Sequence, residues 1–182
     1  MKHKDEAPEA VIRVNEPEPW LRGTHTEIRS VARAVVHALE LTAEDVVRWT
    51  SGLTEEELHQ RAMALPSVAW QIQHLARSVD RLLSYAEGRQ LSAAQMDALR
   101  SEGEPISANA LRAELQTGLQ EGMRRVVALA SVDLETPRCV GRKNLPTTVG
   151  GLLVHVADHT QRHVGQLVTT AKLLLELRNA DR

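Results

Sequence analysis

Residues 155–167 read HVADHTQRHVGQL and place three histidines four residues apart, at His155, His159 and His163. The stretch lies inside a longer segment whose apolar spacing predicts a helix over about residues 148–178. On an α-helix, residues i and i+4 are neighbours on one face. Imidazoles at this spacing can bind a metal ion together, as paired histidines do in other helical zinc motifs.

The three histidines differ in where they lie around this helix. At about 100° per residue, His159 and His163 fall within the apolar arc of the helix, whereas His155 lies at its edge. A buried imidazole without a partner costs roughly 1–3 kcal/mol, a large share of a net stability of about 5–15 kcal/mol. The two histidines in the arc therefore need a metal ion, a carboxylate or a hydrogen-bonded network. The alternative to a metal site is a pair of core histidines bonded to backbone, to Gln166 or to a carboxylate.

A third metal ligand has to come from another helix, and His74 is the best-placed histidine. It lies in the sequence WQIQHLARSVDRL, within a helix predicted over residues 66–88. Its side chain falls beside the apolar stripe of that helix, on the flank that carries Gln71 and Ser78. This position fits a surface histidine, and it fits equally a residue that faces a polar cleft between helices.

The remaining histidines are weaker candidates. His37 fits a core histidine, and its alternatives are a partner that supports a ligand or a wall of the pocket. His3, His25 and His59 fall in or near polar segments and are assigned no role. His74 therefore leads as the third ligand.

The rest of the chain predicts an all-α protein. Apolar residues at helical spacing define four long helices, and shorter helical turns are expected near residues 53–58 and 93–99. The long helices are expected over about residues 26–49, 66–88, 107–130 and 148–178. Four such helices with aliphatic stripes are typical of a four-helix bundle.

Local signals add detail to this layout. Residues 42–45, TAED, resemble a capping box inside the first helix and predict a kink there. Gly118 and Gly122 are four residues apart and predict a close approach by another helix. Residues 131–146 are expected to form a loop. Residues 1–19 are expected to form an extended or disordered tail, and residues 20–182 a single bundle domain.

Composition narrows the classes of function. The chain has 182 residues, a net charge of −2, no phenylalanine and 42% hydrophobic residues. The core must be aliphatic, and the absence of a basic excess argues against nucleic-acid binding. A lone cysteine, Cys139, fits a reducing compartment, and no segment approaches the ~18 apolar residues of a membrane span. With no apolar segment of signal-peptide length at the N-terminus, we expect a soluble, cytoplasmic protein without membrane contact.

These residues carry a resemblance to a known family. The sequence His159-x-x-x-His163-Val-Gly-Gln166 resembles the C-terminal motif of the DinB/YfiT-like superfamily, and His74 in QIQHLARS resembles that family's first ligand. The resemblance covers residues 21–178. It implies an up-down-down-up four-helix bundle, often a homodimer, with a divalent metal held by three histidines.

Carried onto this chain, the resemblance gives His74, His159 and His163 as the metal ligands. In the family another histidine often precedes the last one, and here Arg162 stands in that place. Three neutral imidazoles leave a position on the ion open, which is typical of catalytic sites. Zinc or nickel is expected, and iron and manganese are compatible with the same ligands.

The expected function is metal-dependent attack on a small-molecule electrophile. Such an ion lowers the pKa of a thiol or a water, and some family members resemble S-transferases that use a low-molecular-weight thiol. The reaction is therefore expected to be of S-transferase or hydrolase type, with His155 and Asp158 as the nearest candidates for a catalytic base. The alternative is a non-catalytic helical module that binds a metal or a small ligand. It stays open because members of the family differ in function.

The loop before the last predicted helix carries three basic residues and the cysteine. Arg138, Arg142 and Lys143 could receive an anionic group, or they are a solvated basic loop. Cys139 has no readable activating histidine beside it and is expected to be an inert thiol.

Overall fold

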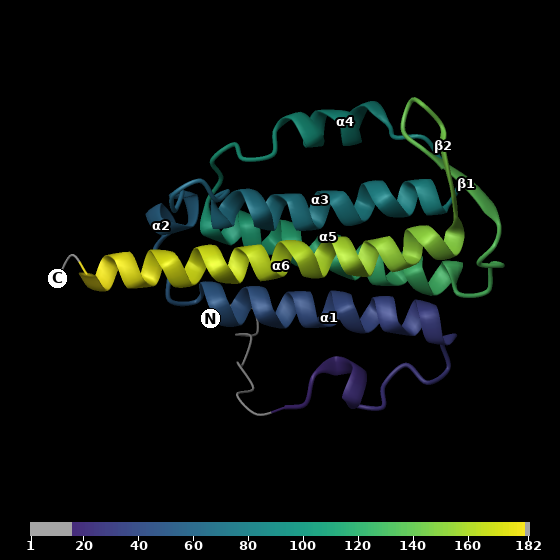
Figure 1. Cartoon of the computed structure of the whole chain (residues 1–182), viewed down its shortest axis with the longest axis horizontal. Helices are drawn as coiled ribbons and strands as arrows, with labels where there is room; N and C mark the ends of the chain where they lie inside the picture. Colours follow the sequence, from purple (N-terminus) through teal and green to yellow (C-terminus); the bar gives the residue numbers. More distant parts are fainter. Residues whose placement is uncertain (1–15, 181–182) are drawn as a thin grey trace, which may run out of the picture.

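Four long helices lie side by side and bury an aliphatic core between them (Figure 1). The computed structural model describes residues 16–180. α1 and α3 each pack against both α5 and α6. The long helices are α1 (Ser30–Thr50), α3 (Val68–Ala86), α5 (Ala108–Leu129) and α6 (Val149–Ala180). The predicted all-α class is confirmed in that the fold is mostly helical, with one small two-stranded sheet.

The other elements of the described chain are short. They are a 3-10 helix η1 (Pro19–Leu21), the helices α2 (Glu55–His59) and α4 (Ala93–Arg100), and the strands β1 (Pro137–Val140) and β2 (Leu145–Thr148). α4 lies over α3 on one side of the long helices, and the N-terminal segment lies along α1 on the opposite side (Figure 1). The expected helical turns near residues 53–58 and 93–99 correspond to α2 and α4.

Side-chain caps fix where several helices begin. Ser67 Oγ accepts a hydrogen bond from the Trp70 amide at 3.2 Å, and Ser107 Oγ accepts one from the Ala110 amide at 3.3 Å. Each bond satisfies one of the amides that a helix N-terminus leaves free. Thr148 Oγ1 accepts in the same way at the start of α6. Polar residues in the sequence therefore mark the observed helix starts.

The kink predicted at residues 42–45 is wrong, because α1 runs through them without interruption. Thr42 Oγ1 donates to the Ala38 carbonyl at 2.8 Å, one helical turn back, so this side chain does not cap a new helix. Gln161 of α6 donates to the same carbonyl at 2.9 Å and to Thr42 Oγ1 at 3.1 Å. A contact between two helices thus uses the threonine that looked like a cap.

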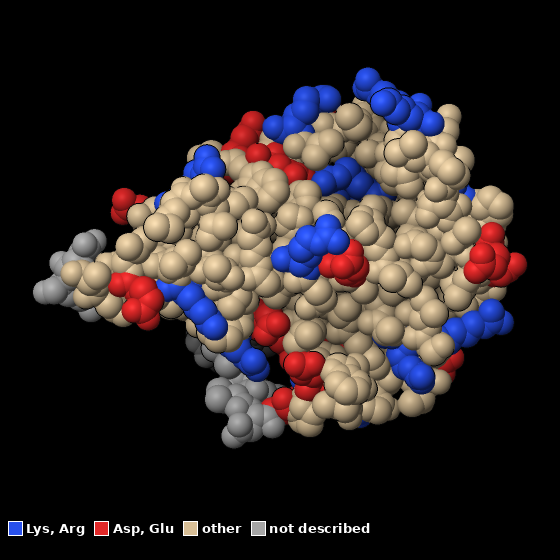
Figure 2. All heavy atoms as spheres, in the orientation of Figure 1, with Lys and Arg blue, Asp and Glu red and all other residues tan. Residues whose placement is uncertain are grey.

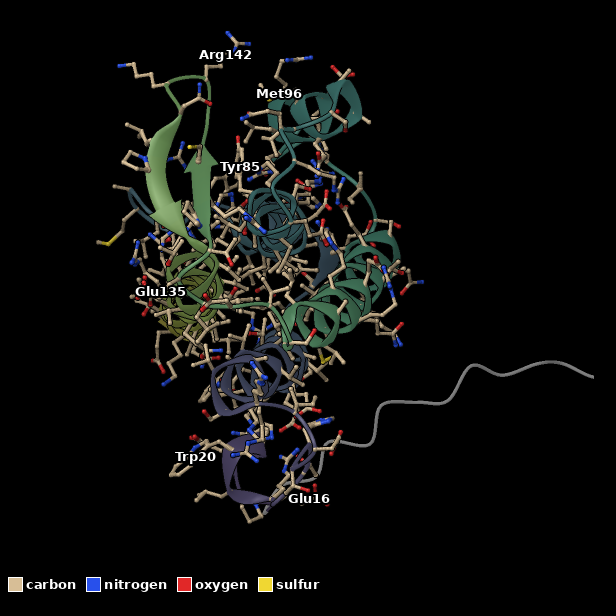
Figure 3. The ribbon with its side chains drawn as sticks, turned by 90° about the vertical axis from the view of Figure 1, so that its right-hand side faces the viewer. Glu16, Trp20, Tyr85, Met96, Glu135 and Arg142 are labelled. Carbon is tan, nitrogen blue, oxygen red and sulfur yellow. The ribbon has the colours of Figure 1, made fainter. Side chains whose placement is uncertain are left out.

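The loop predicted over residues 131–146 is in part a β-hairpin. β1 and β2 pair antiparallel, with Pro137 opposite Thr148 and Val140 opposite Leu145. Gly141 adopts φ +70° in the turn, a backbone conformation that glycine reaches without steric cost. Figure 3 shows Arg142 at the tip of this hairpin.

The end of the predicted N-terminal tail is packed against the bundle. Residues 1–15 lie outside the described part of the chain, so the expectation for them stays a prediction. From η1 onward the segment contacts α1. The Arg22 guanidinium donates two hydrogen bonds to the Glu44 carboxylate, at 2.5 and 2.8 Å, and so fastens the segment to that helix.

The surface carries charges of both signs. On the face shown in Figure 2, lysines and arginines are interspersed with aspartates and glutamates, and no single sign covers the face. Among the helices of residues 16–180, none has the combined length and apolar character that crossing a bilayer requires.

The glycines of α5 lie where the sequence predicted a close approach. A Cβ on Gly122 would lie 2.7 Å from Val79 Cγ1, and one on Gly118 would lie 3.0 Å from Ala76 Cβ. Gly122→Ala should therefore destabilise the protein by about 1–2 kcal/mol, because overpacking outweighs the gain in helix propensity. Urea unfolding of the metal-free protein, followed by circular dichroism, measures this effect.

Gly165 is the matched control, because it is also helical but a Cβ there meets no atom within 4 Å. Gly165→Ala should raise the free energy of unfolding by up to about 1 kcal/mol. Equal changes in the two variants would contradict the close contact between α3 and α5.

Candidate metal centre

Two helices bring the three predicted ligand histidines together. His74 lies on α3 and His159 and His163 on α6, and these helices pack against each other. One ring nitrogen from each histidine lies within 4.8 Å of the other two. Nε2 of His74 and Nε2 of His159 are 3.0 Å apart, and the ring centroids of His74 and His163 are 4.4 Å apart.

The imidazoles are partly buried, which corrects their expected position in the core. The buried stripe of α6 runs through Val156, Thr160 and Val164, and His159 and His163 lie beside it. The polar neighbours of His74 also differ from expectation, because Gln71 and Ser78 are buried inside the bundle and do not line an open cleft. The three histidines therefore sit at the edge of the core, where solvent reaches them.

The Glu102 carboxylate contacts the Nδ1 side of the His74 ring, and this contact was not predicted from the sequence. The Glu102 side chain is only 5% exposed, and its Oε2 lies 2.8 Å from His74 Nδ1. Arg81 Nη1 donates to the other carboxylate oxygen at 2.6 Å. Burial by itself raises the pKa of Glu102, but the hydrogen bonds from His74 and Arg81 outweigh it and hold that pKa below its usual value.

The hydrogen bond between Glu102 and His74 decides which tautomer His74 adopts. An ionised carboxylate only accepts hydrogen bonds, so Nδ1 of His74 must carry the proton. The lone pair of the neutral ring then lies on Nε2, the nitrogen that faces His159. A carboxylate bonded to the far nitrogen of a histidine is the usual support of a metal ligand.

The loop that carries Glu102 is itself fixed to α3. Gln73 is 1% exposed, and its Oε1 accepts from the Gly103 amide at 2.6 Å while its Nε2 donates to the Glu104 carbonyl at 3.1 Å. Trp70 stacks on His74, with ring centroids 4.8 Å apart and planes 9° apart. Gly103, at φ +94°, packs against the Trp70 ring so closely that a Cβ would lie 2.8 Å from Cδ1. His74 is thus positioned before any ion binds.

Burial keeps the two histidines of α6 neutral. It lowers the pKa of His159 to about 4, with further contributions from the nearby His163 and His74 rings. Burial likewise lowers the pKa of His163 to about 4, with contributions from His74 and Arg162. Both rings therefore offer free lone pairs at neutral pH, as a metal ligand must.

The residues fit a divalent ion. His163 Nδ1 is buried and has no hydrogen-bond partner among the described residues, so protein groups alone leave this cluster incompletely bonded. Nitrogens bound to one ion at ~2.0–2.1 Å lie roughly 3.0–3.4 Å apart, and the 3.0 Å between His74 and His159 agrees with this spacing. Imidazole ligands suit zinc, nickel, iron and manganese.

The two predicted catalytic candidates lie beside the centre on α6, His155 one turn before His159 and Asp158 directly before it. The His155 ring centroid is 5.4 Å from that of His159, and its Nδ1 is 3.6 Å from Asp158 Oδ2. Asp158 is 54% exposed, and its Oδ2 accepts a hydrogen bond from Arg162 at 2.6 Å. Of the two, His155 is the group placed beside a ligand ring.

The basic residues of the hairpin are not gathered into one anion site. Arg138 uses its guanidinium on backbone carbonyls, donating to Ala86 at 2.7 Å and to Pro137 at 2.9 Å. Arg142 and Lys143 are exposed at the turn. Cys139 is a free, exposed thiol in β1.

The lowered pKa values predict how acid affects the metal-free protein. Between about 4 and the ordinary imidazole pKa of ~6.5, the unfolded chain binds protons at His159 and His163 that the native state does not. The free energy of unfolding therefore falls as the pH decreases from about 6.5 to about 4, and rises as the pH increases through this window. Urea midpoints at several pH values measure the slope.

The variant His159→Gln separates the effect of the histidines on the pH dependence of stability from the effect of the carboxylates. This variant lacks one of the two histidines. Its free energy of unfolding should therefore depend less steeply on pH in the same window, by the equivalent of up to one proton taken up on unfolding. An unchanged slope would contradict the lowered pKa of His159.

Little in the sequence points to the residues that support the histidines. Glu102 reaches His74 from the loop after α4, 28 residues away along the chain, and Arg81 of α3 bonds to Glu102 and not to His74. The one local hint is Gly103, directly after Glu102, because a glycine often marks a backbone turn that a larger residue cannot make.

Comparison with known proteins places the chain in a family. The sequence model of the DinB superfamily matches residues 38–167, a span that includes His74, Glu102, His159 and His163. Among curated proteins, no match to the chain is found. Because the match covers well over half of the sequence, the chain belongs to the DinB superfamily.

Proposed function

We propose that the protein is a metal-dependent enzyme that attacks a small electrophile with a thiol or a water, as an S-transferase or a hydrolase. The observation that carries the proposal is the convergence of His74, His159 and His163, each with one ring nitrogen within 4.8 Å of the others. A low-molecular-weight thiol is the proposed co-substrate. The proposal includes the up-down-down-up bundle of the family, a homodimer and action in the cytoplasm.

The proposed ion is zinc or nickel, held by the three imidazoles. When bound, it would supply positive charge that stabilises the deprotonated form of a thiol or a water at neutral pH. Three neutral ligands leave that charge uncompensated, which is why a three-histidine site suits an anionic nucleophile. Glu102 lies behind His74, and hydrogen bonds from His74 and Arg81 already occupy its two oxygens.

The protein's own residues orient the ligands and move the proton. Trp70 covers one face of the His74 ring and the Glu102 carboxylate bonds its Nδ1, and together these contacts restrict the orientation of the ring. His155 is 45% exposed and stands one turn from His159, so it can take a proton near the centre and release it to solvent. Asp158 and Arg162 form an ion pair at the rim, next to His155.

A conjugation assay tests this function. A low-molecular-weight thiol and an electrophilic aryl halide are mixed with zinc-loaded protein, and a nitrophenyl ester tests hydrolysis in parallel. We expect turnover that a chelator removes and that zinc restores. His163→Ala should abolish turnover, whereas His155→Ala should reduce kcat by about 10²-fold or more while zinc remains bound.

Arg142→Ala is the matched control, because Arg142 lies at the exposed tip of the hairpin. It should leave turnover unchanged. If none of the substrate pairs reacts, or if chelator has no effect on turnover, the enzyme proposal fails and the protein is a binding module.

A further inference from the structure

A second group of ligand-type side chains lies between the N-terminal segment and α1. One nitrogen each from His25 and His37 and a carboxylate oxygen of Glu40 all lie within 4.8 Å of one another. His25 Nε2 and Glu40 Oε1 are 2.7 Å apart, and the two imidazole centroids are 5.6 Å apart. This group shares no residue with the three-histidine centre.

Helical spacing and a tight turn bring these residues together. His37 and Glu40 are three residues apart on α1 and so share one face of the helix. His25 adopts φ 57°, a left-handed conformation that costs a non-glycine residue roughly 1–2 kcal/mol. Its carbonyl accepts a hydrogen bond from the Ile28 amide at 3.0 Å, which closes the turn and directs the chain back into α1.

The site is partly buried and remains open on one side. His37 is 7% exposed, while the side chains of His25 and Glu40 are 32% and 28% exposed. His37 also lines a hollow of about 420 Å³ between α1 and the N-terminal segment, whose wall includes Trp20 and Arg33 but neither His25 nor Glu40. Figure 3 shows Trp20 on that segment, at the side of the molecule away from α4. Because His25 and Glu40 are partly exposed, an ion can reach them from solvent, and water can complete its coordination.

The charges around the site are mixed, and Glu40 is the group that favours a cation. Glu40 supplies a negative charge that the three-histidine centre lacks among its ligands. The neighbouring Glu44 is already paired with Arg22. Arg33 lies one helical turn before His37 and lines the same hollow, so its positive charge opposes a cation there and the Glu40 carboxylate has to offset it.

We propose that His25, His37 and Glu40 form a second binding site for a divalent transition-metal ion, with zinc as its expected occupant. Two imidazoles and one carboxylate are an established set of zinc ligands with room for water. Because His25 comes from the N-terminal segment and the other two ligands from α1, the ion fastens that segment to the bundle. His37 Nε2 now lies 3.1 Å from Thr24 Oγ1, so the same turn supports the ring.

Zinc stoichiometry tests the proposal. The full chain and its variants are dialysed against zinc at pH 7.5 and analysed for metal content per chain. The wild type should bind two zinc ions, and the double variant His159→Ala/His163→Ala should keep one. Glu40→Gln and His37→Ala should each bind one zinc ion, and Glu40→Gln in the double-variant background should bind none.

Glu44→Gln is the matched control. It breaks the Arg22–Glu44 pair that also fastens the segment, but it leaves all three proposed ligands in place. It should therefore bind two zinc ions, as the wild type does. If Glu44→Gln loses an ion as Glu40→Gln does, release of the segment explains the loss and the proposal is overturned.

Two further results would also overturn the second site. One is a wild type that binds a single zinc ion, which the double variant His159→Ala/His163→Ala loses. The other is unchanged zinc content in both Glu40→Gln and His37→Ala. Failure of the three-histidine centre is distinguishable, because the wild type would then bind one ion that Glu40→Gln and His37→Ala each remove and that the double variant His159→Ala/His163→Ala keeps.

Discussion

Replacing His163 by alanine should remove one zinc ion from the protein and with it the thermal stabilisation that this ion confers. Three imidazoles converge on one point, and two of them cannot hold the ion alone with comparable affinity. We expect an affinity loss greater than the 10–100-fold that removal of a supporting partner causes. Competition with a chromophoric chelator measures the affinity, and the zinc-dependent rise in Tm reports the same binding.

His155→Ala is the control for this prediction, because His155 lies on the same helix and its ring is 5.4 Å from that of His159. It should bind zinc with the affinity of the wild type. Equal losses in the two variants would mean that the histidines act only through general charge near α6. Full zinc binding by His163→Ala would exclude His163 as a ligand.

Replacing Glu102 by glutamine should weaken zinc binding at the three-histidine centre by about 10–100-fold. The carboxylate accepts from His74 Nδ1 at 2.8 Å and so fixes both the tautomer and the orientation of that ring. Glutamine preserves the shape but removes the charge, and it leaves Arg81 without its ionic partner. The same chelator competition measures the change.

Glu114→Gln is the matched control, because Glu114 also pairs with an arginine of α3, Arg77, at 2.5 Å. It should leave zinc affinity unchanged. If Glu102→Gln and Glu114→Gln behave alike, the role of Glu102 is limited to its ion pair and does not extend to His74.

The helices could be predicted because their signals are local. Ser67 and Ser107 cap the amides three residues ahead, and apolar residues at intervals of three and four define the faces that become buried. Gly118 and Gly122 predicted a close contact for the same reason, because a missing side chain is visible in the sequence whatever the partner helix is.

The two errors in the fold have different causes, a contact between distant segments for Thr42 and weak local signals for the hairpin. Thr42 could have capped a new helix, but Gln161 bonds to it from 119 residues away and α1 continues. The hairpin was missed because its strands are four residues long and each contains a proline, Pro137 or Pro146, which is unusual in a strand.

Some residues of the candidate site could likewise be predicted from the sequence, and others could not. The spacing of His159 and His163 is a property of one helix and was readable, and their meeting with His74 was expected from the bundle and the family resemblance. Glu102 could not be assigned, because it lies 28 residues from His74 and carries no spacing signal. Trp70 stands four residues before His74 on α3, so its spacing was readable, but its stacking on the His74 ring was not predicted. Burial also lowers the pKa of His159 and His163 to about 4, and only the packed structure shows how far these rings are desolvated.

The most direct test of the three-histidine centre is zinc X-ray absorption spectroscopy of the Glu40→Gln variant loaded with one equivalent of zinc. That variant lacks one of the three proposed ligands of the second site, so the spectrum reports on the centre formed by His74, His159 and His163. We predict three imidazole nitrogens at ~2.0–2.1 Å, with oxygen completing the shell. A shell made only of oxygen, or a variant that retains no zinc, would contradict the metal centre.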